Sequence, residues 1–193
     1  MSAAPEPGRF TALSRALHWL TAALVFCALF IGFVMVNSVG DYAALIMIHR
    51  TLGVTILVVV LVRVVNRLTH RAPPLPPTVG ALERKIVVLS ELSLYALLLA
   101  QPVIGWAMVS AAGNPVVVFG SLRLPRIAPF DARLFWLLRQ AHSVVAYALM
   151  AAIAAHVSAI LLHTLTLRDR MIERMTFRFG PKDDRSRLDI PGS

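Results

Sequence analysis

The chain has 193 residues, of which 58% are hydrophobic and only 15% are charged, and its formal net charge at pH 7 is +9. Because an average soluble domain carries about 25% charged residues, this composition excludes an ordinary soluble protein. The length fits a single integral membrane domain over 1–193, an all-α bundle of four spans of about 20 apolar residues each.

In chain order, the predicted spans run over 16–36, 43–65, 86–110 and 134–163. The first is too long for the apolar region of a signal peptide, so we expect it to remain in the mature protein. The short polar link 37–41 makes the first two spans antiparallel neighbours, and the proline-rich segment RAPPLPPTVG predicts a stiff extended crossover to the third. The longest connection, 113–133, contains aromatic and proline residues that predict a structured cap.

The distribution of Lys and Arg predicts the orientation of the bundle. Fourteen of the 19 basic residues fall on the side of the N-terminus and five on the opposite side, so both termini are expected in the cytoplasm. The basic tail over 168–193 is expected to lie along anionic lipid headgroups, and the positive charge therefore requires no nucleic-acid partner.

Five arginines on the outer side run against this charge rule. Two interpretations remain open: their side chains snorkel at the interface, or they attract a small anion to the outer face. These residues are Arg50, Arg123, Arg126, Arg133 and Arg139.

Histidines inside the spans are the strongest functional signal, because ionisable groups are costly within a bilayer. His142 and His156 lie fourteen residues apart in the fourth span. This spacing places both imidazoles on nearly the same helix face, about 21 Å apart along the axis. With the predicted topology, depth pairs His49 with His142 near the outer side and His18 with His156 near the inner side.

A facing pair of imidazoles suits a haem iron, which takes two axial ligands on opposite sides of a flat ring. Zinc and copper sites instead gather three or four ligands at one point. Two pairs therefore predict two haems. Taken singly, each histidine could also be a hydrogen-bonded core residue. His70 is expected to be solvated in the proline-rich loop, and His163 emerges at the cytoplasmic interface.

Several segments in order along the chain resemble the bacterial cytochrome b561 family, from about Arg9 to Met175. They are LSRALHWLTAAL, IHRTLGVTILVVVLVRVVNRL, QPVIGWAMVSAAG and AHSVVAYALMAAIAAHVSAILLH followed by RDRMIERM. The resemblance implies a four-helix protein of the inner membrane that carries two b-type haems and exchanges electrons with ubiquinone. The axial ligands of the family fall on His18, His49, His142 and His156.

The resemblance also implies the chemistry. Family members include a superoxide oxidase, which passes electrons from periplasmic superoxide to ubiquinone, and this is the expected function. Other members serve as the electron-transfer and anchor subunit of a periplasmic dehydrogenase or a nickel hydrogenase, and this role is the alternative function. A haem-free membrane transporter is the weakest alternative. Many relatives carry a histidine near the position of Glu91, where this chain has a carboxylate.

Four further residues are candidates for the inner side. Arg15, Glu91 and His163 could bind ubiquinone or relay its protons, although Glu91 could equally be a helix-end charge facing the cytoplasm. Arg63 lies in the apolar end of the second span, where an unpaired guanidinium is costly. It either pairs with a propionate of the inner haem or snorkels to the headgroups.

Overall fold

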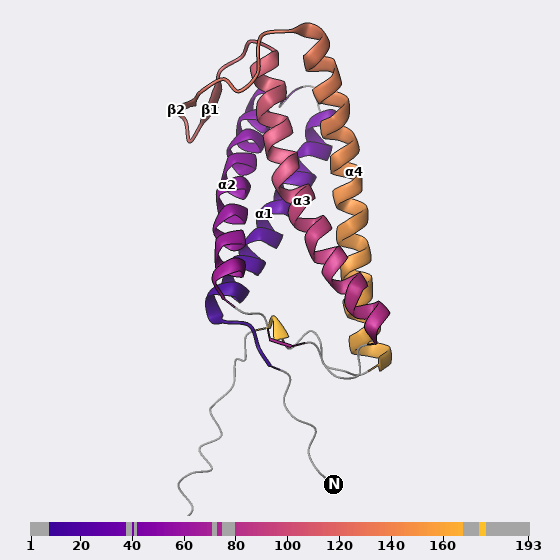
Figure 1. Cartoon of the computed structure of the whole chain (residues 1–193). Coiled ribbons are helices and arrows are strands. Elements are labelled where there is room, and N and C mark those ends of the chain that lie inside the picture. The colour runs from indigo at the N-terminus through magenta and orange to yellow at the C-terminus, as the bar shows by residue number, and fades with distance from the viewer. Residues whose placement is uncertain are drawn as a thin grey trace, which may run out of the picture.

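The structure is a computed structural model, and it describes residues 8–37, 40, 42–70, 73–74, 80–167 and 174–176. Four long helices run antiparallel to their neighbours in sequence and form one elongated bundle (Figure 1). They are α1 (Ala12–Asn37), α2 (Tyr42–Thr69), α3 (Ala81–Ala111) and α4 (Ala132–Leu162). A short π-helix, η1 (His163–Leu167), follows α4 directly.

All four helices are long and apolar enough to cross a membrane. The predicted spans coincide with them, and the fourth continues into η1, so the predicted four-span all-α architecture is confirmed. Large apolar side chains cover the outer surface, as lipid contact requires. Most of the proline-rich crossover and of the basic tail lies outside the described residues.

The two ends of the bundle differ. One end, here the hairpin end, carries the link from α1 to α2 and the connection from α3 to α4. The other, here the terminal end, carries the start of α1, the end of α2, the start of α3 and the end of α4 (Figure 1). The expected cytoplasmic side corresponds to the terminal end.

The long connection at the hairpin end contains a β-hairpin, which the sequence analysis did not predict. Strands β1 (Val116–Val118) and β2 (Leu122–Leu124) pair antiparallel, with Val117 opposite Arg123. Val116 and Val118 are buried against α2 and the end of α3, where they pack near Val54 and Val109. The Trp106 indole donates to the Pro125 carbonyl at 2.9 Å. The expected structured cap is therefore present, as a hairpin that packs on both α2 and α3.

At the terminal end, the short segment 174–176 returns to the start of α1. Arg174 is only 5% exposed. Its guanidinium donates to the carbonyls of Gly8, Pro73 and Pro74 at 3.4, 2.7 and 3.1 Å, and it lies over the Phe10 ring. For Arg174 the expected headgroup contact is therefore wrong: backbone carbonyls and an aromatic ring solvate this charge in place of lipid.

Candidate functional site

His49 on α2 and His142 on α4 meet inside the bundle towards the hairpin end. Their ring centroids are 6.2 Å apart and the ring planes are inclined at 78°. Glycines make room for both rings: a Cβ at Gly32 would lie 3.3 Å from Cε1 of His49, and one at Gly105 would lie 3.0 Å from Cε1 of His142. The two residues form the hairpin-side histidine pair.

A cavity of about 100 Å³ lies at the hairpin-side histidine pair. Small residues on two helices, Gly53 and Ala146, contribute to its wall, and a Cβ added to Gly53 would meet nothing within 4 Å. The wall is otherwise mostly apolar. The remaining lining residues are Val25, Ala28, Leu29, Ile56, Leu98, Gln101, Pro102 and Leu149.

Gln101 on α3 is a polar member of this site that the sequence analysis missed. Its Nε2 lies 3.2 Å from Nε2 of His142 and donates to the His142 carbonyl at 3.1 Å. Three buried polar atoms here have no hydrogen-bond partner among the described residues: Nδ1 of His49, Nδ1 of His142 and Oε1 of Gln101. Because unpaired buried polar atoms are costly, they indicate a site made for a ligand. The available signal was that Gln101 is the only amide in its predicted span.

His18 on α1 and His156 on α4 form the terminal-side histidine pair. Both are half-buried, and electrostatic interactions connect them with each other and with Arg63 of α2. Nη2 of Arg63 donates to Nδ1 of His18 at 3.0 Å, and its guanidinium lies 5.2 Å from the centroid of the Tyr95 ring. Arginine has only donors, so Nδ1 of His18 presents a lone pair. Arg63 thus points into the bundle beside a histidine.

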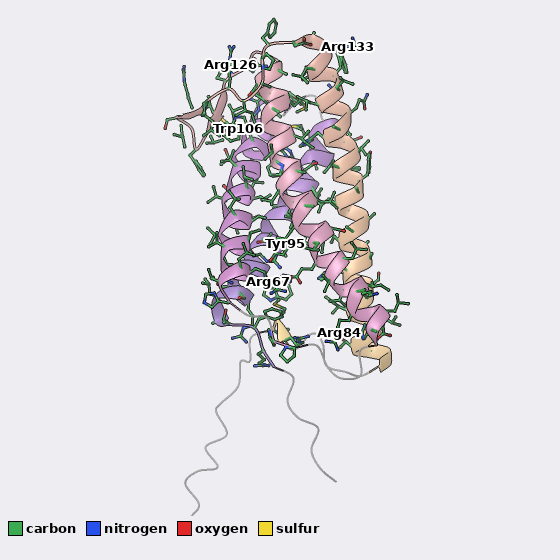
Figure 2. The ribbon with its side chains drawn as sticks, in the orientation of Figure 1. Arg67, Arg84, Tyr95, Trp106, Arg126 and Arg133 are labelled. Atoms are coloured by element: carbon green, nitrogen blue, oxygen red, sulfur yellow. The ribbon has the colours of Figure 1, made fainter. Side chains whose placement is uncertain are left out.

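Glu91 on α3 is held in an ion pair with Arg67 of α2. The Arg67 guanidinium donates to both carboxylate oxygens, at 2.7 and 3.1 Å. Each side chain keeps more than a third of its surface exposed. The pair lies on the terminal-end side of Tyr95 (Figure 2), and Glu91 also interacts electrostatically with His156. A charged hydrogen-bonded pair therefore borders the terminal-side histidines.

The two other inner-side candidates also lie at the terminal end. Nη1 of Arg15 donates to the Thr176 carbonyl at 3.1 Å, which links α1 to the returning segment 174–176. His163 is half-buried and is the first residue of η1, directly after the end of α4. Arg15 lies three residues before His18, within one helical turn of it, whereas His163 lies seven residues after His156.

The two histidine pairs occupy separate levels of the bundle. Between them lies an apolar cluster made by all four helices, which includes Val25, Ile56 and Leu149. Each of these three residues follows a histidine of its helix by seven positions, and Leu149 also precedes His156 by seven. The cluster therefore separates the two levels.

The packing of the helices leaves space where the histidines face each other. Helix α1 packs on α2, α2 on α3, and α3 on α4. Among the described residues, the pairs α2–α4 and α1–α4, which carry the facing histidines, are not closely packed. This space, the unpaired ring nitrogens and the glycine contacts fit a flat cofactor with two axial imidazoles. In the described part of the chain there is no cluster of three or more His, Cys, Asp or Glu residues that could hold a metal ion by itself.

The outer arginines are distributed around the hairpin end. Arg123, Arg126, Arg133 and Arg139 are exposed and Arg50 is half-buried. Figure 2 shows Arg126 and Arg133 at this end of the bundle and Arg84 at the opposite end. The Arg126 guanidinium donates to the Gly113 carbonyl at 3.4 Å, and that of Arg139 lies over the Trp136 ring. The hairpin end therefore presents positive charge to solvent.

Comparisons with known proteins agree with this architecture. The model of the family described as prokaryotic cytochrome b561 matches residues 9–178. The chain is 30% identical over 186 residues to Cytochrome b561 homolog 2 of Escherichia coli K12, covering 91% of this chain and 95% of that protein. It is 27% identical over 168 residues to Probable superoxide oxidase CybB of Yersinia pestis, covering 86% and 95%. Cytochrome b561 homolog 1 of Escherichia coli K12 is 25% identical over 170 residues, covering 86% and 96%.

Proposed function

Since this chain belongs to the prokaryotic cytochrome b561 family, we propose that it is a di-haem cytochrome that oxidises superoxide and reduces ubiquinone. Family membership makes it a multi-pass bacterial membrane protein with electron-transfer function and implies that it binds haem b. The bacterial inner membrane, the number of haems, the donor and the acceptor are parts of the proposal.

The arrangement of the four histidines carries the proposal. In this proposal His49 and His142 hold one haem and His18 and His156 hold the second, so the fourth helix serves both. When bound, haem b would supply a one-electron iron couple, and the imidazoles of each pair would hold it. Arg63, which points inward beside His18, is positioned to pair with a propionate of the terminal-side haem.

The positive charge at the hairpin end supports the proposal that an anionic electron donor reacts at this end. Arginines on this end raise the local concentration of a small anion and its rate of encounter. The relative from Yersinia pestis is named a probable superoxide oxidase. In the proposed reaction, two superoxide anions each lose one electron and leave as dioxygen. One ubiquinone takes up the two electrons and two protons to become ubiquinol.

In this proposal ubiquinone binds at the terminal end, which is expected to face the cytoplasm because of its excess of basic residues. Its protons would then come from the cytoplasmic side. Arg15, His163 and Glu91 are the polar groups proposed to bind the quinone or pass protons to it. Glu91 already shares both oxygens with Arg67, so a relay through it requires this ion pair to open.

The test is a superoxide-to-ubiquinone assay on the purified, haem-loaded protein in lipid nanodiscs. Superoxide is generated enzymatically, and ubiquinol formation is followed by absorbance with and without superoxide dismutase. We expect paired b-type bands in the visible spectrum and ubiquinol formation that the dismutase abolishes. His70→Ala is a matched control, because His70 is exposed and lies outside both pairs. A haem-loaded protein that forms no ubiquinol from superoxide would refute the proposed donor.

A second candidate function, an electron-transfer and anchor subunit for a periplasmic dehydrogenase or hydrogenase, is favoured by the apolar surface of the hairpin. Phe119 is 64% exposed and Leu122 is 53% exposed, and both lie at the tip of the cap. A partner enzyme could cover them. Ubiquinone reduction that appears only with a co-purifying dehydrogenase would favour this function. The haem-free transporter has no support once the chain belongs to a cytochrome family.

A further inference from the structure

A second cavity, of about 140 Å³, opens at the terminal end, outside both histidine pairs. Its wall comes from the segment that leads into α1 and from the last turn of α2, with Pro73 beyond it. In contrast to the cavity beside His49, most of the residues that line this pocket are polar or charged. The lining residues are Arg9, Phe10, Thr11, Ser14, Asn66, Arg67, His70 and Pro73.

Within the described residues, the positive charge of this pocket is not fully balanced. Of its two guanidinium groups, that of Arg67 is neutralised by Glu91. Arg9 is half-buried and forms no hydrogen bond or ion pair with any residue in the described part of the chain. The start of α1 adds the positive end of a helix dipole. An anion in the pocket would therefore meet an uncompensated positive charge.

Side chains on the pocket wall form a chain of hydrogen bonds, and one acceptor in this chain has no partner among the described residues. Asn66 is 7% exposed, and its Nδ2 donates to Oγ of Ser14 at 2.8 Å. Ser14 in turn contacts Thr11, whose hydroxyl oxygen accepts from the Ser14 amide at 3.2 Å. Oδ1 of Asn66 is buried without a partner among the described residues. A buried acceptor of this kind requires a donor, which a ligand in the pocket would supply.

The pocket is held in place by the returning C-terminal segment. Arg174 lies over the Phe10 ring and donates to the Pro73 carbonyl, so it fixes two walls of the pocket. The pocket itself lies where α1 begins and α2 ends, and the ends of membrane-spanning helices are where lipid headgroups are expected.

We propose that this pocket binds a phosphate anion that also carries a hydroxyl donor. Arg9 pairs with the anionic oxygens, and Oδ1 of Asn66 accepts from the hydroxyl. Two ligands share this chemistry: the headgroup of phosphatidylglycerol from the adjoining leaflet, and free hydrogen phosphate from solution. The pocket would stabilise the terminal end of the bundle without taking part in electron transfer.

The test measures lipid retention by native mass spectrometry on the haem-loaded full chain. The protein is exchanged among phosphatidylglycerol, phosphatidylmethanol, which has the same charge but no hydroxyl, and phosphatidylcholine. We expect phosphatidylglycerol to be retained best and Arg9→Gln to weaken its retention about tenfold or more, because a charge-assisted hydrogen bond is lost. Arg84→Gln, which removes a charge from the same end outside the pocket, should leave retention within about twofold. Unchanged haem spectra report correct folding of each variant.

Two further arms separate the ligand sources and test the role of the amide. Asn66→Leu should remove the preference for phosphatidylglycerol over phosphatidylmethanol while anion binding persists. Competition by millimolar inorganic phosphate would support the same chemistry with a soluble source, and lack of competition would support the lipid. Equal retention of the three lipids, or equal effects of Arg9→Gln and Arg84→Gln, would overturn the proposal.

Discussion

The two histidine pairs lie in the same bundle but in different electrostatic surroundings. The hairpin-side pair faces an apolar cavity and has a neutral amide, Gln101, as its polar neighbour. The terminal-side pair has the cationic Arg63 in contact with one ring and the Arg67–Glu91 ion pair beside it. A nearby positive charge stabilises the reduced form of a redox centre relative to its oxidised form. If each pair holds a haem as proposed, the terminal-side haem is expected to have the higher potential, which would make transfer from the hairpin end energetically favourable.

Removing one histidine from each pair is the strongest test of two separate levels. We expect His49→Ala to abolish binding of the hairpin-side haem and His18→Ala to abolish binding of the terminal-side haem, each leaving the other in place. Each variant should lose half of the haem absorbance, as measured by a pyridine haemochrome assay and a redox titration, and should lose ubiquinol formation. His70→Ala should retain both haems. Loss of both haems in either variant would show that the levels are not independent.

Filling the space beside one pair tests whether it is a cofactor cradle. A Cβ on Gly53 meets open space, so Gly53→Leu is expected to be tolerated by the haem-free bundle but to exclude the hairpin-side haem. The readouts are the absorbance of the hairpin-side haem and the melting temperature of the haem-free protein. Gly40→Leu, at a loop position with no neighbour within 4 Å, is the matched control. Full haem loading of Gly53→Leu would contradict the assignment of this space.

Charge reversal at the hairpin end tests the encounter with superoxide. We expect the double variant Arg123→Glu and Arg126→Glu to slow ubiquinol formation about tenfold at low ionic strength, because electrostatic steering is reversed. The difference should shrink as salt is added, since exposed charges are screened. Arg84→Glu, at the terminal end, should have little effect. Rates that depend equally on all three positions would indicate a general effect of net charge.

Arg63→Leu tests the electrostatic difference between the pairs directly. Loss of a contacting positive charge is expected to lower the midpoint potential of the terminal-side haem by about 60 mV, the equivalent of a tenfold change in a one-electron equilibrium. The hairpin-side potential should not move. The double variant Arg67→Leu and Glu91→Leu is the control, because it removes an ion pair without changing the net charge. An unchanged redox titration would favour a purely structural role for Arg63, and loss of haem with intact helices would favour propionate pairing.

Hydropathy and depth predicted more of this molecule than they missed. The four spans follow from apolar length alone, and the proximity of His49 to His142 follows from antiparallel spans and their depth. The hairpin did not follow, because strands of three residues are too short to show an alternating pattern. The contacts of Gly32 and Gly105 with the histidine rings were also missed. Glycine is common wherever membrane helices approach each other, so its presence in the sequence does not indicate a neighbouring ring.

Replacing Arg174 is expected to have the smallest effect, which is confined to the terminal end. Burial lowers the pKa of its guanidinium from the usual range, although arginine remains charged near neutral pH. Arg174→Leu leaves the carbonyls of Gly8 and Pro73 without this donor, at a cost of about 1–3 kcal/mol. We expect faster hydrogen exchange at the Phe10 amide, which donates to the Arg174 carbonyl at 3.3 Å. Arg84→Leu should leave this amide protected. Because Arg174 contacts neither histidine pair, the potentials of both proposed haems should stay constant. A shift in the terminal-side potential alone would show that the returning segment 174–176 also influences the electrostatics of the terminal-side pair.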